Sequence, residues 1–327
     1  MLLGHEYVHS WNAKYRRPAG LLSPDYQKPM DGTLLWVYEG MTEFWGEVLP
    51  TRAGLVTKKF YLETLASYAG HYDNQPGTNW RPLVDTATAA QVLYPAPDAW
   101  ESARRGVDFY EASVFLWYDV DAEIRARTAG KASLDDFVAQ FYAGTSGAPQ
   151  LKPYVEDDVY AALNAVAPND WRAFIHRHLD ARNNKTLLGM FDRSGYKLEY
   201  SAVKNDYMEV RQKRRENLDR QWSIGLIISK EGEITDTDED RAAAKAGIGP
   251  GMKLIAVNGK KYTDDVLDAA ITEAQKTRKP IELLVDNADY FKTFKVEYYD
   301  GLRFPHLVRV EDKPDVLSKV LEGRVKP

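Results

Sequence analysis

The chain has 327 residues, more than a single hydrophobic core usually contains, so we expect two domains or one large domain with an appendage. With 44% hydrophobic and 28% charged residues, the composition is that of a folded protein and excludes a disordered or fibrous one. The 43 Lys and Arg are outnumbered by 48 Asp and Glu, which argues against a nucleic-acid partner. Cysteine is absent, and this excludes disulfides, cysteine nucleophiles and thiolate metal ligands.

The chain begins with a histidine-rich segment of helical pattern, LLGHEYVHSW, that has no capping residue before it. Residues 1–4 are too few, and lack the positive charge, for a signal peptide. No apolar run approaches the ~20 residues that a membrane span requires. We therefore expect no membrane span, and a chain that enters its first domain in the middle.

Helices are predicted throughout the first 194 residues. Apolar residues recur at helical spacing over 33–53, 58–69 and 106–127, whereas the four prolines of 74–99 indicate an extended crossing segment. Further helices are predicted in SLDDFVAQFYAG, where Ser133 and Asp136 form a capping box, and in EDDVYAALNAVA and NDWRAFIHRHLDA. Since nothing here alternates like a strand, residues 1–194 should form one mainly helical lobe.

Beyond Gly195 the pattern becomes that of a small α+β domain, predicted to span 195–300. Its expected strands are GYKLEY, WSIGLIIS, MKLIAVNGK, PIELLVD and TFKVEYY, and its expected helices are DRAAAKAG and DDVLDAAITEAQK. The charged run at 209–220 is interpreted as a solvated linker or helix between the first two strands. Residues 301–327 should form a tail that packs back on the body.

His5, Glu6 and His9 spell H-E-x-x-H. On a helix the two histidines are four residues apart and lie on one face, so both imidazoles can reach one metal ion while Glu6 lies beside it. This pattern arises by chance in on the order of one such sequence in a hundred. The spacing therefore predicts a zinc site.

A catalytic zinc site needs a third protein ligand and an open fourth position. Glu39 is predicted as that ligand because it lies on an otherwise apolar helical face, where an unpaired carboxylate is costly to bury. Glu43 and Glu47, on nearly the same face, are its rivals. Glu43 is better placed to accept a hydrogen bond from a ligating imidazole, with an ordinary surface glutamate as the alternative.

Several segments resemble the glycyl aminopeptidase family of gluzincin metallopeptidases, relatives of aminopeptidase N that carry a C-terminal PDZ domain. The resemblance runs along essentially the whole chain and rests on GHEYVHSWN, LLWVYEGMTEFWG, DFYEASVFLWYDVDAEIR, SLDDF and GLRFPHLVRV. It implies a multidomain protein in which the mainly α-helical C-terminal lobe of a thermolysin-like catalytic domain precedes an α+β PDZ domain. It also implies one zinc ion per chain, bound by His5, His9 and Glu39.

In that family's chemistry, as the resemblance implies, Glu6 takes a proton from water and passes it to the leaving amine. A tyrosine in a Y-x-K-G-A segment donates to the oxyanion, and DFYEASV aligns Tyr110 with it. This sequence departs from the pattern by having Ala112 and Ser113 in place of Lys and Gly, so packing is the alternative role of Tyr110. Tyr7 is interpreted as a packing residue. The remaining histidines lack metal spacing and are predicted to be surface or locally bonded residues: His71, His176, His178 and His306.

The segment AAAKAGIGPGMKLIAVNGK at 242–260 resembles the bacterial PDZ pattern, with a tight Asn-Gly turn at its end. PDZ domains hold a peptide carboxylate on backbone N–H groups while the peptide adds as a strand to the sheet edge. The candidate loop and strand contain Ile224, Gly225 and Leu226. The alternative is that the chain's own residues occupy this groove and the domain only supports the catalytic unit.

The function predicted from these features is a zinc aminopeptidase, or its zinc-bearing fragment, acting on peptides with a free N-terminus. The resemblance alone implies a glycine or alanine preference, and it favours the bacterial periplasm over the cytoplasm. Because family members place a β-sandwich domain and the sheet-bearing lobe before the zinc helix, we expect the C-terminal part of a longer enzyme whose N-terminal lobe is missing. The alternative is an inert fragment that acts as a PDZ peptide-binding module.

Overall fold

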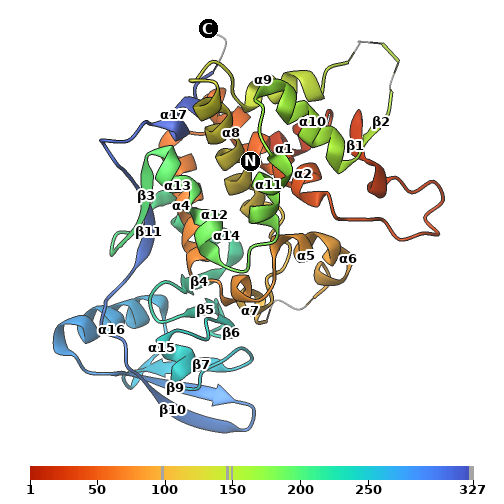
Figure 1. Ribbon diagram of the computed structural model, residues 1–327. Helices are drawn as coiled ribbons and strands as arrows, with labels where there is room; N and C mark the ends of the chain where they lie inside the picture. The colour runs from red at the N-terminus through yellow and green to blue at the C-terminus, as the bar shows by residue number, and fades with distance from the viewer. Residues whose placement is uncertain (97–98, 145–146, 149, 324–327) are drawn as a thin grey trace.

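The computed structural model describes residues 1–96, 99–144, 147–148 and 150–323 of the protein. Its buried apolar side chains form a large cluster, which extends from Val8 to Tyr196 and is joined by Leu317, Val320 and Leu321. A smaller cluster extends from Leu218 to Tyr298. We call the two parts of the molecule built on these clusters the helical part and the second unit; Figure 1 shows the second unit below the helical part.

The helical part is built around α8 (Glu111–Arg127), which is buried along most of its length because the residues of its first two turns, Ala112 to Tyr118, are nearly all apolar, whichever side of the helix they face. α8 packs against α3 (Gly40–Arg52), which in turn packs against α1 (Leu2–Val8). The other helices of this part are α2 (Leu35–Tyr38), α4 (Lys58–Asp73), α5 (Leu83–Thr88), α6 (Ala90–Leu93), α7 (Glu101–Arg104), α9 (Leu134–Phe141), α10 (Glu156–Val166), α11 (Trp171–Leu179), α12 (Asn184–Leu188) and α13 (Met190–Ser194), with the short 3₁₀ helices η1 (Ala19–Leu21) and η2 (Pro76–Asn79).

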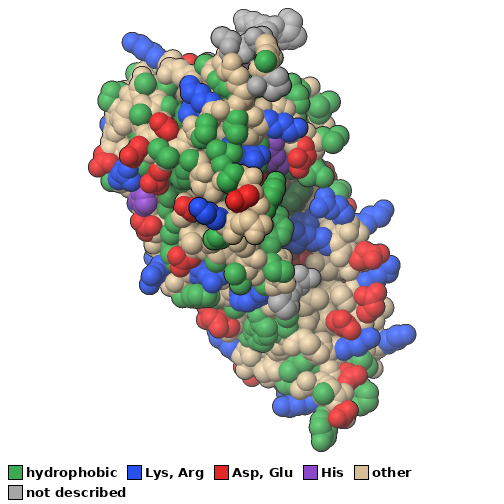
Figure 2. All heavy atoms as spheres, turned by 90° about the vertical axis from the view of Figure 1, so that its right-hand side faces the viewer, with side chains coloured by type: hydrophobic (Ala, Val, Ile, Leu, Met, Phe, Trp, Pro, Cys, Tyr) green, Lys and Arg blue, Asp and Glu red, His purple; other side chains and the backbone are tan. Residues whose placement is uncertain are grey.

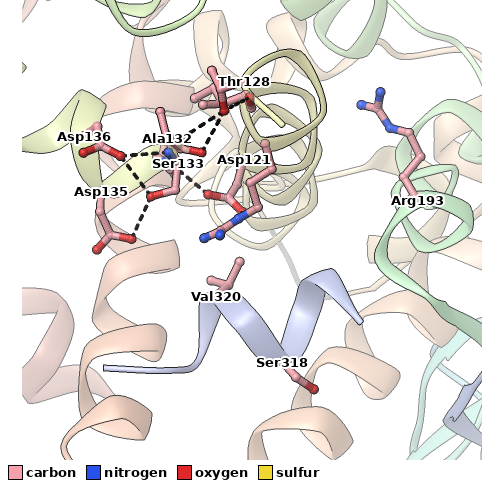
Figure 3. Close-up of polar contacts among 12 residues, drawn as sticks. Asp121, Thr128, Ala132, Ser133, Asp135, Asp136, Arg193, Ser318 and Val320 are labelled. Carbon is pink, nitrogen blue, oxygen red and sulfur yellow. Dashed lines mark hydrogen bonds and ion pairs between the residues drawn. The ribbon is translucent and has the colours of Figure 1, made fainter. Parts of the chain in front are cut away.

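The helices predicted in the first half are confirmed, with two differences. The segment 74–99 is not extended: it contains η2, α5 and α6, since Pro76 begins η2 and Pro82 is the N-cap of α5, where the missing N–H costs nothing. Two three-residue strands, β1 (Arg16–Pro18) and β2 (Lys152–Tyr154), pair in parallel, and they are too short to alternate visibly in the sequence. The capping box of α9 is confirmed (Figure 3), because the Ser133 N–H donates to Asp136 Oδ2 at 2.8 Å.

The second unit contains two sheets and two helices. One sheet has the order β4-β5-β6 and the other β10-β9-β7-β8, and neighbouring strands in both are antiparallel. The elements are β4 (Asn217–Arg220), β5 (Leu226–Ser229), β6 (Ile234–Thr237), α15 (Ala242–Lys245), β7 (Lys253–Val257), β8 (Lys260–Lys261), α16 (Asp264–Thr277), β9 (Ile281–Asn287) and β10 (Tyr290–Val296).

Strand β3 (Tyr196–Ser201) lies with the helical part, although it was predicted in the second domain. It pairs with β11 (Phe304–Arg309), and both strands contact α4. The end of the chain also returns to this part, because α17 (Val316–Val320) contacts α13; residues 324–327 lie outside the described residues. The change from one core to the other therefore lies nearer residue 217 than residue 195.

The charged run at 209–220 is only partly what the sequence predicted. Its first half lies in the helix α14 (Asp206–Arg215), as expected, but its second half is not solvated. Asp219 and Arg220 are 0% and 1% exposed in β4. Arg211 donates to Asp219 Oδ2 at 2.7 Å, and Arg220 donates to both carboxylate oxygens of Asp268. These charges are buried because each has a partner on a neighbouring helix.

Candidate metal centre

The two histidines of the H-E-x-x-H motif lie on one face at the end of α1, with their ring centroids 4.8 Å apart. Glu39 is the single residue between α2 and α3, and its backbone is helical. Its side chain therefore projects from nearly continuous helix toward α1. Among the described residues, the only group of three histidine, aspartate or glutamate side chains able to share a metal ion is His5, His9 and Glu39, whose ligand atoms all lie within 4.8 Å of one another.

Glycine residues allow α1 to approach α3 this closely. A Cβ atom on Gly46 would lie 2.6 Å from the Cα atom of His5, and one on Gly4 would lie 2.5 Å from the carbonyl oxygen of Gly46. Contacts this short are forbidden, so a side chain at either position would push the helices apart. Since α3 carries Glu39 and Glu43, this crossing brings both carboxylates to His5. The sequence analysis did not identify either glycine.

The orphaned oxygen of Glu39 is the strongest indication of a bound cation. Its Oε2 atom lies 3.3 Å from the Nε2 atom of His5 and 3.3 Å from that of His9. This oxygen is buried and accepts no well-formed hydrogen bond. Burying an acceptor without a donor is costly, whereas two imidazole nitrogens and a carboxylate oxygen are the ligand set that zinc prefers. The residues therefore fit a zinc ion.

Both histidines are oriented by hydrogen bonds from the other ring nitrogen. His5 Nδ1 donates to Glu43 Oε2 at 2.6 Å, the contact predicted for Glu43, and His9 Nδ1 donates to the Asn12 carbonyl oxygen at 3.0 Å. Such bonds fix the tautomer that leaves Nε2 available to a metal. The Asn12 side chain donates to the Val37 and Tyr38 carbonyls, which ties the end of α1 to α2. The sequence analysis missed Asn12, because a backbone acceptor leaves no side-chain signal.

The charges around the site reinforce one another. Burial lowers the pKa of His5, but hydrogen bonds and charges from Glu39 and Glu43 outweigh it and raise that pKa to about 9. Burial likewise raises the pKa of Glu39, and the close contacts with the imidazoles of His5 and His9 outweigh it, so the net pKa is lowered. The two histidines thus stabilise the ionised form of the Glu39 carboxylate, which is the form that binds a metal ion.

Of the three glutamates weighed as ligands, only Glu39 lies between the two histidines. Glu47, two turns along α3, is 1% exposed and accepts a hydrogen bond from the Tyr68 hydroxyl at 2.8 Å. Burial, with a smaller contribution from Glu43, raises the pKa of Glu47 well above its usual range. It is thus a buried carboxyl group of the core rather than part of the candidate centre.

The candidate catalytic residues lie at the rim. Glu6 is exposed on α1 beside His5. Tyr110 is half-buried at the start of α8, with its ring centroid 5.9 Å from that of His5. Burial raises the pKa of its hydroxyl, and the charge of Glu39 adds to the effect. The Tyr110 hydroxyl is therefore neutral, and its ring lies beside a histidine of the candidate centre.

A second small-residue contact positions Tyr110. A Cβ atom on Gly40 would lie 2.2 Å from the Cβ atom of Ser113, so α3 meets α8 here with no room for a side chain on Gly40. Ser113 is one of the two positions at which the sequence departs from the family's segment. The serine is small enough to preserve the contact, so the departure does not displace Tyr110 from the centre.

The remaining predicted side chains lie elsewhere. All four other histidines form local contacts, with His178 the most buried at 2.8 Å from Asp119 and the rest bonded to Gln221, Asp180 and Ser201. Tyr7 was expected to pack but is 62% exposed and meets only the ring of Trp11 among the described aromatic side chains. Among the described residues, none of these four histidines belongs to the group able to share a metal ion.

Strand β5 cannot accept a peptide as the sequence predicted, because it has no open edge. It pairs with β4 on one side and β6 on the other. Ile224 and Leu226 are both 0% exposed, and the Gly225 N–H donates to the Arg220 carbonyl at 3.0 Å. The alternative reading, in which the chain's own residues occupy this place, is the one that the structure favours.

The face that Figure 2 presents is hollowed, and a histidine side chain lies in the hollow with hydrophobic, basic and acidic side chains around it.

Among the described residues, the helices are all too short or too polar to cross a membrane.

Comparisons with known proteins point to the peptidases. Residues 1–116 match the sequence model of the M61 glycyl aminopeptidase family. A crystal structure of an aminopeptidase N family protein from Idiomarina loihiensis has a similar fold, with a TM-score of 0.72 and 18% sequence identity. The match covers 98% of this chain and 54% of that protein, so the chain spans about half of its length. No curated protein matches the chain.

Proposed function

We propose that the chain carries the catalytic centre of a zinc-dependent aminopeptidase, with zinc held by His5, His9 and Glu39. The observation that carries this proposal is the buried Oε2 atom of Glu39, which lies between two imidazole Nε2 atoms and has no hydrogen-bond donor. The family match supports a peptidase and extends over the residues that form the centre. The similarity in fold to an aminopeptidase N family protein agrees with it.

The reaction follows from the residues around the centre. When bound, zinc supplies Lewis acidity, which polarises a scissile carbonyl and lowers the pKa of water. Glu6, an exposed carboxylate beside His5, takes the proton of the attacking water and returns it to the leaving amine. The hydroxyl of Tyr110 donates to the developing oxyanion, for which its raised pKa suits it, because it holds its proton throughout.

The proposed substrates are peptides with a free N-terminus, and a small first residue, glycine or alanine, is carried over from the family resemblance. The second unit is proposed to be a PDZ-like domain that supports the helical part. β4 occupies the side of β5 at which a peptide could add, and the Ser102 hydroxyl and N–H of the helical part both bond Asp236 of β6.

The test is a comparison of the wild type with Glu6→Gln, because this change removes the base and leaves the metal ligands intact. Both proteins should bind one zinc ion per chain, measured by metal analysis after dialysis. Only the wild type should hydrolyse glycyl and alanyl arylamides, with kcat lower in the variant by roughly 10²- to 10⁴-fold. Full activity of zinc-loaded Glu6→Gln, or a wild type that binds no zinc, would contradict the proposal.

A further inference from the structure

Two consecutive arginines in β1 have different surroundings. The backbone of a strand points successive side chains to opposite sides, so Arg16 and Arg17 face different environments. Arg16 is 7% exposed, donates to the Phe141 carbonyl at 2.9 Å and stacks on the ring of Phe141. The guanidinium of Arg16 therefore interacts with groups of the core. Arg17 is only half-buried and faces away from these groups.

Arg17 lacks a charged partner. Among the described residues it forms no ion pair with a carboxylate, and its buried Nε atom has no hydrogen-bond acceptor. The contact that it does make is with Tyr38, whose ring centre lies 6.0 Å from the guanidinium carbon. A partly desolvated cation without an anion is unfavourable. A guanidinium in this state is suited to a ligand carboxylate, which its planar fork binds through two hydrogen bonds.

Arg17 is also near the candidate metal centre. The ring of Tyr38 contacts both, with its centroid 5.1 Å from that of His9 and 6.0 Å from the guanidinium carbon of Arg17. An extended peptide advances roughly 3.3–3.6 Å per residue. One to three residues of a substrate that is being cleaved at the centre therefore span the distance to the guanidinium.

We propose that Arg17 binds the C-terminal carboxylate of short peptide substrates, and so makes the enzyme favour dipeptides and tripeptides over longer chains. This inference rests on the proposed aminopeptidase function. The sign of the charge decides which end of the substrate it meets, because a guanidinium repels the α-ammonium group and attracts the carboxylate. Arg17 therefore belongs to the leaving-group side of the scissile bond.

The experiment measures binding rather than turnover. Zinc-loaded Glu6→Gln protein is titrated calorimetrically with Ala-Gly-Gly as the free acid, with its C-terminal amide, and with Ala-Glu-Gly amide. The free acid should bind roughly 10- to 100-fold more tightly than Ala-Gly-Gly amide, the usual strength of a hydrogen-bonded charge. Adding Arg17→Gln should lower the affinity for the free acid to that of the amide. Arg17→Lys should retain part of the preference, because it keeps the charge and loses the fork.

A matched control separates this role from a general effect of losing an arginine. Arg303 is also half-buried over a tyrosine ring, with its guanidinium carbon 4.5 Å from the centre of Tyr200, but it lies in the segment before β11. Arg303→Gln should leave the preference for the free acid unchanged. Zinc content of each variant, measured alongside, shows that the centre is intact.

Three results would overturn the inference. Equal binding of the free acid and the amide would mean that no carboxylate is recognised. A preference for the free acid that survives Arg17→Gln would mean that another residue recognises the carboxylate. Tight binding of Ala-Glu-Gly amide, at the level of the free acid, means that an acidic side chain is the ligand instead. A different result would contradict the proposed function itself: a zinc-loaded wild type that hydrolyses no aminoacyl arylamide or peptide.

Discussion

The α3 carboxyl groups at and beside the candidate metal centre and the paired charges of the second unit are buried in opposite ways. In the second unit, Arg220 is 1% exposed and donates to both carboxylate oxygens of Asp268. In the helical part, Glu39 carries a buried oxygen with no donor, and Glu47 carries another. Buried charges that are fully paired hold a scaffold together, whereas buried acceptors without a donor need another explanation. For Glu39 the adjacent histidines supply an explanation under the proposed function, a shared metal ion, and Glu47 has no such neighbours.

The largest expected effect separates these two orphaned carboxyl groups. Glu39→Gln should abolish stoichiometric zinc binding, because it removes one of three protein ligands. Glu47→Gln, two turns along the same helix, should retain one zinc ion per chain. Metal analysis after dialysis tests both proteins. A Glu39→Gln protein that keeps full zinc affinity would move the third ligand elsewhere, most readily to Glu43.

Tyr110→Phe should leave zinc content unchanged and lower kcat by roughly 10²- to 10³-fold, the usual effect of losing one donor to an oxyanion. Tyr94→Phe is its control, since the two hydroxyls lie 3.3 Å apart but Tyr94 is 65% exposed. That variant should keep kcat nearly unchanged. Steady-state kinetics with an alanyl arylamide decides the matter, and an unaltered kcat for Tyr110→Phe would leave this tyrosine a packing residue.

The paired charges of the second unit should affect stability and not zinc binding. Asp268→Asn leaves the buried guanidinium of Arg220 without its anion, so we expect a loss of about 3 kcal/mol, the lower end of the range for a broken buried pair. The exposed pair of Lys295 and Glu282, 3.7 Å apart, offers the control, and Glu282→Gln should change stability by less than about 0.5 kcal/mol. Urea unfolding measures both. Loss of zinc from folded Asp268→Asn protein would contradict the separation between the two parts.

Glu43→Gln should weaken zinc binding roughly 10- to 100-fold without abolishing it, because Glu43 orients His5 and does not contact the metal. The measurement is a competition titration against a chromophoric chelator. An unchanged affinity would show that the hydrogen bond from His5 Nδ1 to Glu43 contributes nothing to the metal centre.

A further effect concerns Glu47 and depends on pH. Because burial raises its pKa in the folded state, its contribution to stability is fully present below the unfolded pKa of about 4.3 and is lost as the pH rises toward the folded value. The glutamine of Glu47→Gln does not titrate. The free energy of unfolding of this variant minus that of the wild type should therefore rise by about 1.4 kcal/mol per pH unit in that window. Urea unfolding at pH 5, 6 and 7 with excess chelator tests this. A pH-independent difference would mean that Glu47 is ionised in the fold.

Much of the fold could be read from local pattern. Helix periodicity located α3, α4 and α8, and alternation located β5, β7, β9 and β10 but not β4 and β6, because a residue's burial follows from its position on a single element. The segment 74–99 was misread, because proline disfavours helix interiors but not helix starts. Strand β3 was assigned to the wrong core, since its alternation is the same whichever partner it pairs with.

The sequence by itself determined that His5 and His9 can share one ion, because four residues of helix place them on one face. It also predicted Glu39 as the third ligand, with Glu43 and Glu47 as rivals on nearly the same helical face. Which of the three lies between the two histidines depends on the tertiary structure, because it follows from where α1 crosses α3, and that crossing is set by the contact of Gly4 with Gly46. The same holds for the pairing of β5 and for the environment of Arg17. Spacing along one element is a property of the sequence, whereas contact between two elements depends on the side chains that both bring to their meeting point.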